Sequence, residues 1–129
     1  MPQIKIYGLE ECLKPKRELL SNVLHSCIVE AFKYPLDKSA HRFFYLDQKD
    51  FYYPQGRSKQ YTIIEISLFE GRSIESKRML YKLIFERFEN EMGISANDIE
   101  ITLTETPIYN WGIRGKSADE LLLDYQIRI

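Results

Sequence analysis

Two parts of this 129-residue sequence share one pattern of apolar and polar positions when the chain is shifted by 60 residues. The matched pairs are Ile4 with Ile64, Ile6 with Ile66, Glu10 with Glu70, Leu19 with Met79, Leu20 with Leu80, Val23 with Leu83, and Phe32 with Met92. Few pairs are identities, so the match lies in the pattern more than in the residues. An internal repeat of this kind indicates a fold built from two similar supersecondary units.

The first unit is predicted to be a strand, a helix and a second strand. Residues 2–8 alternate in polarity, which is typical of a short strand that Gly8 ends. A helix is expected after Pro15, because an apolar stripe at helical spacing runs through Leu19, Leu20, Val23, Leu24, Cys27, Ile28, Ala31 and Phe32. A second strand is expected over residues 42–46.

The second unit repeats this order. Residues 61–69 are rich in β-branched and aromatic side chains and form the clearest strand of the chain. Ser73 is a good N-cap for a helix that Gly93 ends. A fourth strand is expected over residues 99–104. The predicted pseudo-repeats therefore cover about 2–46 and 62–105.

A C-terminal arm over about 107–129 completes the expected single domain of residues 1–129. Ser117 and Glu120 have the spacing of a capping box, which predicts a short helix over 118–123. The alternation of Tyr125–Ile129 predicts a final strand on a sheet edge.

The element order β-α-β-β-α-β leaves two topologies open. A ferredoxin-like domain has this order with an antiparallel sheet. Alternatively, each unit forms a parallel strand pair through a right-handed crossover, and the two units join antiparallel. Periodicity does not distinguish these arrangements.

Composition and charge exclude several classes of protein. A net charge of −1 and a pI of about 6.1 argue against a nucleic-acid partner. No window approaches the roughly 18–20 apolar residues of a membrane span, and the first residues do not read as a signal peptide, so a cytoplasmic location is expected. Cys12 and Cys27 do not make a disulfide framework, and with only two histidines no metal-ligand cluster is expected.

The second residue carries the strongest chemical signal. Met1-Pro2 is a context in which the initiator methionine is normally removed, and this exposes a secondary amine on Pro2. An α-amino group has a pKa near 7.7–8.0, and burial lowers this pKa further. Such a group is suited to general acid–base work near neutral pH.

Three motifs join Pro2 in resembling one family. Met1-Pro2-Gln3-Ile4-Lys5-Ile6, Phe69-Glu70-Gly71-Arg72-Ser73 and Asn110-Trp111-Gly112-Ile113-Arg114-Gly115, together with the two β-α-β units, resemble the tautomerase superfamily. The closest likeness is to its longer single-chain branch, which includes malonate semialdehyde decarboxylase and cis-3-chloroacrylic acid dehalogenase. The resemblance implies an α+β fold with a four-stranded mixed sheet and two helices on one face. It also implies a cofactor-free homotrimer with active sites between subunits.

The resemblance implies roles for two residues above all. In this topology the first and third strands are antiparallel neighbours, so Pro2 would lie beside Glu70-Gly71-Arg72. Pro2 would move a proton between carbon and oxygen. The Arg72 guanidinium would bind a substrate carboxylate and stabilise negative charge on an enolate.

Other positions are candidates for substrate binding. His41 and Arg42 begin the second strand and can reach the adjacent pocket, and His41 titrates near neutrality. Trp111 and Arg114 are expected to wall or close the pocket, although Trp111 could equally fill a subunit interface.

Two acidic positions depart from the decarboxylase pattern. Glu70 stands where that enzyme carries a second arginine, which makes a dianionic substrate harder to accommodate. The acidic residue that works with the decarboxylase's proline follows its first helix, and Asp37 here is out of register by one residue.

The sequence thus predicts a tautomerase-type enzyme that acts on a small 2-oxo or unsaturated carboxylic acid. If Pro2 stays protonated, the same pocket favours hydration, dehalogenation or decarboxylation instead. The alternative is a ferredoxin-like or inactive tautomerase-fold module that binds a small ligand or a protein partner.

Overall fold

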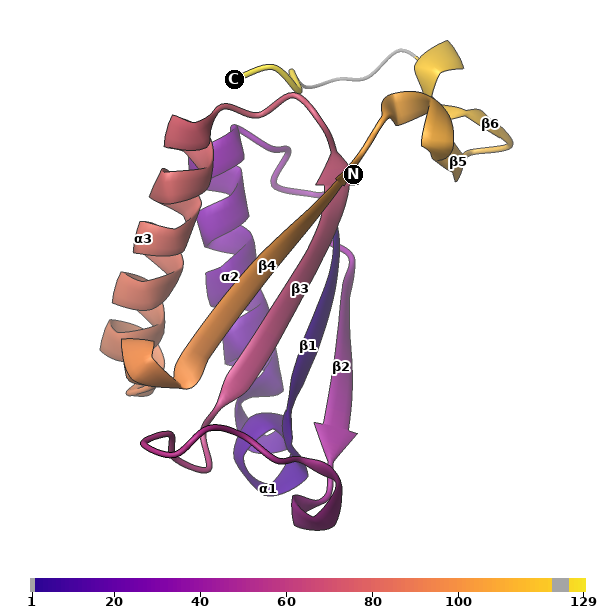
Figure 1. Ribbon diagram of the computed structural model, residues 1–129. Helices are drawn as coiled ribbons and strands as arrows, with labels where there is room; N and C mark the ends of the chain where they lie inside the picture. Colours follow the sequence, from indigo (N-terminus) through magenta and orange to yellow (C-terminus); the bar gives the residue numbers. More distant parts are fainter. Residues whose placement is uncertain (1, 122–125) are drawn as a thin grey trace.

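The computed structural model describes residues 2–121 and 126–129, in which two long helices cover one face of a four-stranded sheet (Figure 1). The strands of this sheet are β1 (Gln3–Leu9), β2 (His41–Leu46), β3 (Thr62–Phe69) and β4 (Ile99–Thr106). The α-helices are α1 (Glu10–Leu13), α2 (Arg17–Phe32) and α3 (Ile74–Met92). The short elements are the 3-10 turns η1 (Lys14–Lys16), η2 (Gln48–Asp50), η3 (Ala96–Asp98), η4 (Ile108–Asn110) and η5 (Ala118–Glu120) and the small strands β5 (Gly112–Ile113) and β6 (Lys116–Ser117).

The sheet has the order β2-β1-β3-β4 and resolves the choice between topologies. β1 pairs with β2 in parallel, β3 pairs with β4 in parallel, and the central strands β1 and β3 are antiparallel. The two β-α-β units therefore each form a parallel pair, and the ferredoxin-like alternative is wrong. This arrangement confirms the expected α+β fold with a mixed sheet.

The core lies between the sheet and the long helices because the strands alternate. In β1 and β3, every second side chain (Ile4, Ile6, Ile64, Ile66 and Leu68) is at most 1% exposed. These side chains pack against the apolar faces of α2 and α3, including Leu24, Phe32, Leu80 and Phe88. Burying one such side chain stabilises the fold by about 1.5–3 kcal/mol.

The helical region begins earlier than the sequence predicts. We expected a helix to start after Pro15, but α1 begins at Glu10 and continues through η1 into α2. Pro15 occupies one of the first two positions of the 3-10 turn, where its missing N–H costs no helical hydrogen bond. The acidic pair Glu10 and Glu11 stabilises the first turn.

Two members of the predicted apolar stripes are exposed. Leu19 on α2 is 43% exposed, and Met79 on α3, its match in the repeat, is 44% exposed. Both lie at the edge of the stripe, and their neighbours Leu20 and Leu80 are fully buried.

The C-terminal arm differs from the prediction. η5 is a single 3-10 turn over Ala118–Glu120. The helix predicted over 118–123 also includes residues 122 and 123, which lie outside the described residues. The final strand predicted over Tyr125–Ile129 is wrong for residues 126–129, which form no strand. The reason is that Ile129 bonds to side chains: the hydroxyls of Ser73 and Ser76 each donate to its carbonyl oxygen at 2.8 Å.

Gly71 makes room for this C-terminal segment, residues 126–129. Its φ is +131°, a conformation that favours glycine, and a Cβ there would lie 2.8 Å from Cγ2 of Ile127.

Gly71→Ala should therefore lower the free energy of unfolding by about 1–3 kcal/mol through strain and this clash. Urea unfolding measures the loss. Gly93→Ala is the matched control, because Gly93 also has a positive φ of +66° but no atom lies within 4 Å of its added Cβ. An equal loss in both variants would show that the C-terminal segment does not press on Gly71.

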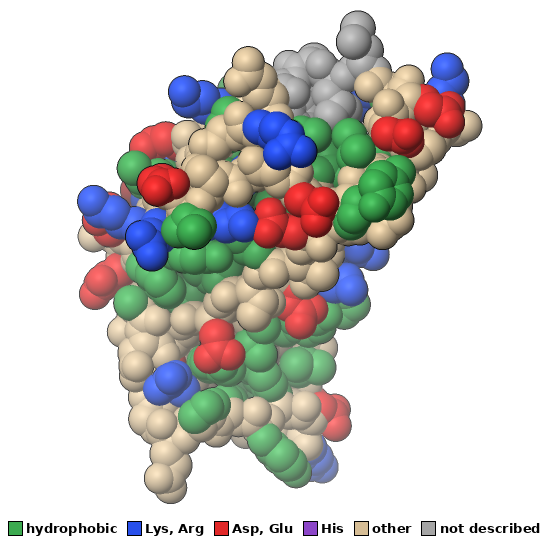
Figure 2. Space-filling view, turned by 45° about the horizontal axis from the view of Figure 1, so that its top comes forward, with side chains coloured by type: hydrophobic (Ala, Val, Ile, Leu, Met, Phe, Trp, Pro, Cys, Tyr) green, Lys and Arg blue, Asp and Glu red, His purple; other side chains and the backbone are tan. Residues whose placement is uncertain are grey.

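Charges on the surface are mixed. On the face shown in Figure 2, acidic and basic side chains are interspersed with apolar ones, as the net charge of −1 suggests. Within the described residues, none of the helices is both long enough and apolar enough for a transmembrane span.

Candidate active site

Pro2 is buried just before β1, where it lines a narrow recess that is partly open to solvent. The lining residues are Pro2, Ile4, His25, Ile28, Tyr34, Lys38, Ser39, Ala40 and His41, and we call this site the Pro2 recess.

The parallel pairing of β1 with β2 creates the Pro2 recess. Ile4 is the register partner of His41, and its amide donates to the carbonyl of Ala40 at 3.0 Å. The residues that lead into β2 therefore lie beside the first residues of β1. His25 reaches the same place from α2, which crosses over the sheet between the two strands.

His41 is held neutral in the recess. Its Nδ1 lies 2.7 Å from the Ser21 hydroxyl, and its ring centroid lies 6.0 Å from that of His25. The expectation that His41 titrates near neutrality is wrong, because burial, with a smaller contribution from His25, lowers the pKa of His41 to about 4. His25 donates from Nε2 to the Leu36 carbonyl at 2.7 Å, because a carbonyl only accepts.

This shift predicts a pH dependence of stability. Between about pH 6.5 and pH 4 the unfolded chain protonates His41 and the folded chain does not, so stability falls as the pH falls through this window. His41→Gln should flatten that part of the curve, measured as the urea midpoint at a series of pH values. His25→Gln should leave most of the slope, because burial is the larger cause of the shift. An unchanged slope in His41→Gln would contradict the assignment.

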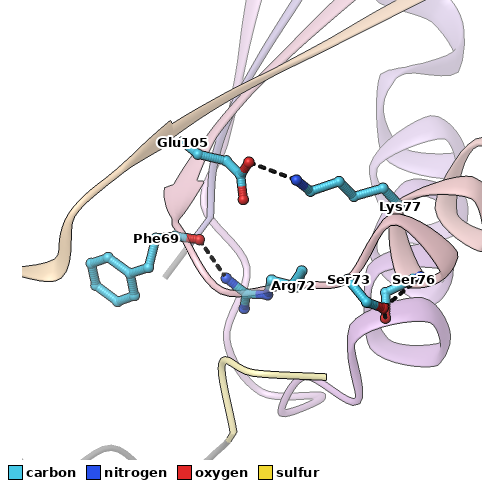
Figure 3. A network of polar contacts seen from close by, with 6 residues as sticks. All are labelled: Phe69, Arg72, Ser73, Ser76, Lys77 and Glu105. Carbon is cyan, nitrogen blue, oxygen red and sulfur yellow. Dashed lines mark hydrogen bonds and ion pairs between the residues drawn. The ribbon is translucent and has the colours of Figure 1, made fainter.

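Arg72 follows β3 and is only 5% exposed. Its Nη1 donates to the Phe69 carbonyl at 3.3 Å, and its Cζ lies 5.0 Å from the centre of the Phe32 ring. Figure 3 shows the guanidinium turned back towards the end of β3, with the C-terminal segment in yellow beside the loop. A guanidinium over an aromatic face is stabilised by a cation–π contact.

Ser73 and Ser76 fix the end of the Arg72 loop. Ser73 is the N-cap of α3 and accepts from the amide of Ser76 at 3.1 Å. Lys77, one turn into α3, pairs with Glu105 of β4 at 2.6 Å (Figure 3). The loop is thereby tied to both the helix and the sheet.

Pro2 and Arg72 lie at the same end of the sheet. Gln3 is the antiparallel partner of Ser67, so continuing the register sets Pro2 opposite Leu68, near the end of β3. Arg72 lies over the ring of Phe32, the last residue of α2. Tyr34, two residues further along the chain, lines the Pro2 recess.

Of the substrate-binding candidates, the structure brings His41 to Pro2 and Trp111 to the end of β3. The Trp111 ring packs on Phe69 with centroids 4.9 Å apart. Arg42 is exposed, and so is Arg114, which lies between β5 and β6 with a φ of +56°. In Figure 1 these two small strands project from the body of the fold beyond β4.

The acidic candidates stand apart from the recess. Asp37 is exposed in the turn before β2 and is not among the residues that line the Pro2 recess. Glu70 is exposed, and its amide donates to the carbonyl of Thr106 at 2.9 Å.

Sequence reasoning missed Lys38, Tyr34 and Ser21. All three depend on the parallel pairing of β1 and β2, which periodicity left open. The short linker over residues 33–40 between α2 and β2 was the available signal, because a short linker leads the chain back to the start of β1.

The described residues contain no group of three or more His, Cys, Asp or Glu side chains placed to hold a metal ion. The polar groups at this end of the sheet include the imidazoles and hydroxyl of the Pro2 recess, the Arg72 guanidinium, and the carboxylates of Glu70 and Glu105. These groups can carry protons and bind a carboxylate.

Comparison with known protein sequences finds a matching family model and related proteins. A family model described as "Tautomerase enzyme" matches residues 38–114, more than half of the chain. The probable tautomerase YusQ of Bacillus subtilis (strain 168) is 25% identical over 116 residues, which span 86% of this chain and 91% of YusQ.

Two solved structures share the fold. Malonate semialdehyde decarboxylase superposes with a TM-score of 0.83 at 22% identity, covering 93% of this chain and 99% of that one. A fused 4-OT, described as an asymmetric trimer, gives a TM-score of 0.80 at 17% identity, covering 92% of this chain and 97% of that one. Both structural similarities extend over the whole β-α-β-β-α-β arrangement.

Proposed function

Because this chain belongs to the tautomerase enzyme family, we propose that it is a cofactor-free tautomerase in which the nitrogen of Pro2 carries a proton on a small 2-oxo or unsaturated carboxylic acid. The observation that carries the proposal is the burial of Pro2 at the end of the sheet where β3 leads into Arg72. The proposal requires removal of Met1, which turns the Pro2 amide into a secondary amine.

Pro2 is the only proton carrier that this reaction needs. The neutral amine takes the proton from the enol oxygen of the substrate, and the prolyl cation then returns it to the neighbouring carbon to give the keto acid. No redox step and no group transfer is involved. General acid–base catalysis by one positioned group contributes about 10²–10⁴-fold.

Arg72 is proposed to hold the substrate carboxylate and to stabilise the enolate. A guanidinium binds a carboxylate through two parallel hydrogen bonds, and it remains charged at every working pH. Trp111 and His41 are proposed to line the substrate path, with Arg42 and Arg114 available from the surface. Asp37 and Glu70 are proposed only as peripheral groups.

A homotrimer is the proposed assembly. The support is the fused 4-OT trimer, which shares this fold. The exposed side chains Leu19 and Met79 and the projecting strands β5 and β6 offer surfaces for such contacts.

The test is enol–keto conversion of phenylpyruvate, with a panel of small unsaturated acids, by the purified protein. Intact mass spectrometry of the same sample establishes whether Met1 is gone. We expect conversion well above the buffer rate from processed protein. Processed protein that accelerates none of these reactions would refute the proposal.

A further inference from the structure

The C-terminal segment, residues 126–129, lies on the loop that carries Arg72. A Cβ placed on Gly71 would stand 2.8 Å from Cγ2 of Ile127 and 3.3 Å from Cγ of Arg128, so both residues pack on the backbone next to Arg72. Figure 3 shows the segment in yellow beside this loop. The chain thus returns, far along its sequence, to its own candidate site.

Contacts with the start of α3 and with the core hold the segment in this place. The hydroxyls of Ser73 and Ser76 each donate to the carbonyl oxygen of Ile129 at 2.8 Å. The amide of Ile129 donates to the carbonyl of Ile127 at 3.2 Å, which folds the segment into a tight turn. The side chain of Ile129 packs against the main core. The segment is therefore docked by polar and apolar contacts together.

Arg72 is closed off in this arrangement. Its side chain is packed over the Phe32 ring and donates to the Phe69 carbonyl, and the whole residue is only 5% exposed. Arg72 is also not among the residues that line the Pro2 recess. A carboxylate that pairs with a guanidinium needs two of its N–H groups turned towards the ligand. A neighbour of Arg72 therefore has to move before a substrate can bind there.

We propose that the C-terminal segment is an autoinhibitory strap, which covers the Arg72 loop and is displaced when a carboxylate binds at Arg72. This inference rests on the proposed function, since it gives the segment control over the same site. The strap and the substrate compete, so each weakens the binding of the other by the same factor. The apparent affinity for substrate is then reduced by the fraction of chains in which the strap is open.

The strap is the neighbour of Arg72 that is easiest to move. Gln126 and Arg128 are exposed, and Ile127 and Ile129 are only half-buried. Its hydrogen bonds to the two serines join neutral groups, and such bonds are weaker than bonds to charged groups. By contrast, the Phe32 and Phe69 side chains on the other sides of Arg72 are at most 1% exposed and belong to α2 and β3.

Ser76→Ala loosens the strap with little other change. It removes one hydroxyl that bonds to Ile129, leaves Ser73 in place as the N-cap of α3, and introduces a strong helix former. We expect KM for phenylpyruvate to fall by about 3–10-fold with kcat unchanged. A chain that stops after residue 125 should lower KM further, by about 10-fold or more.

Ser95→Ala is the matched control. The Ser95 hydroxyl accepts from the amide of Asn97 at 3.2 Å in the turn before β4. Because β3 and β4 are parallel, this turn lies at the end of the sheet opposite to Arg72. The variant should leave KM where it is, and urea unfolding establishes that all variants are folded.

Hydrogen exchange provides a readout that does not depend on turnover. Benzoate supplies a carboxylate that binds but cannot tautomerise, and exchange is followed by mass spectrometry of the C-terminal peptide. Saturating benzoate should speed exchange of the Ile129 amide towards the rate of an unstructured peptide, in wild type and in Ser95→Ala. In Arg72→Met benzoate should have no effect on this amide.

Slower exchange with benzoate, or a higher KM in Ser76→Ala, would show that the segment is a lid that closes on substrate, and the strap would be overturned. Unchanged benzoate affinity in the truncated chain would also overturn it, as would the absence of benzoate binding in both chains. If the truncated chain does not fold, Ser76→Ala decides alone. Faster exchange with benzoate in processed protein that turns over no substrate would leave the strap standing and refute the proposed function.

Discussion

Pro2→Ala is expected to lower kcat/KM for phenylpyruvate enol–keto conversion by about 10²-fold or more. The variant still offers an N-terminal amine after Met1 is removed, but it loses the ring that fixes the nitrogen at the end of β1. Proton transfer needs the nitrogen within hydrogen-bond reach of the substrate, so a rotating primary amine is a poorer base. Continuous absorbance assays on processed protein measure the loss.

Pro15→Ala is the control for removal of a proline. Pro15 is exposed in η1, far along the chain from the Pro2 recess, and its replacement should leave the rate unchanged. Thermal unfolding by circular dichroism establishes that both variants are folded. Full activity in folded, processed Pro2→Ala would remove Pro2 from the mechanism.

Arg72→Met should have the second large effect, a fall in kcat/KM of about 10²–10³-fold, because it removes the charge that holds the carboxylate and the enolate. Methionine retains part of the aliphatic stem. Arg72→Lys keeps the charge but loses the paired donors, and we expect it to recover only part of the rate.

Stability must be measured alongside activity, because Arg72 is buried and packs on Phe32. Loss of the cation–π contact and of the bond to Phe69 should cost about 1–2 kcal/mol of unfolding free energy. Arg78→Met, an exposed position on α3, is the control. Arg72→Met with wild-type kcat/KM would show that this guanidinium is only structural.

The architecture was predictable because the pattern is repeated. Two strands and one amphipathic helix appear twice at the same spacing, and Ser73 and Gly93 mark both ends of α3 as expected. The order of strands was not predictable from periodicity, since parallel and antiparallel neighbours bury the same alternate residues. The family resemblance supplied the correct choice.

The ends of elements and of the chain were less predictable. Pro15 reads as a helix start, yet a 3-10 turn carries it inside a longer helical run. Tyr125–Ile129 alternates as a strand does, but hydroxyls of Ser73 and Ser76 take the carbonyl that a strand partner would need. Such side-chain bonds leave no periodic trace in a sequence.

The candidate site was predicted in outline. Pro2 and Arg72 were named from motifs, and the structure sets both at one end of the sheet. Lys38 was not named, because a single lysine in a turn has no signature. Its position beside Pro2 follows only from the register of β1 with β2.

The internal repeat gives Lys38 a counterpart with the opposite charge in the second unit. Ile4 pairs with His41, so extending this register by two residues pairs Pro2 with Ser39. In the second unit Thr62 takes the place of Pro2, and it pairs with Ile99. The residue before Ser39 is Lys38, and the residue before Ile99 is Asp98.

Asp98 is buried, and its carboxylate accepts from the amide and hydroxyl of Ser58 at 2.7 and 2.6 Å. One unit thus has a proline and a lysine at these positions, and the other has a threonine and an aspartate that anchors the long loop before β3. The two units have become chemically unequal. Each chain accordingly has one proline site, so an assembly of three chains would titrate with a stoichiometry of three and not six.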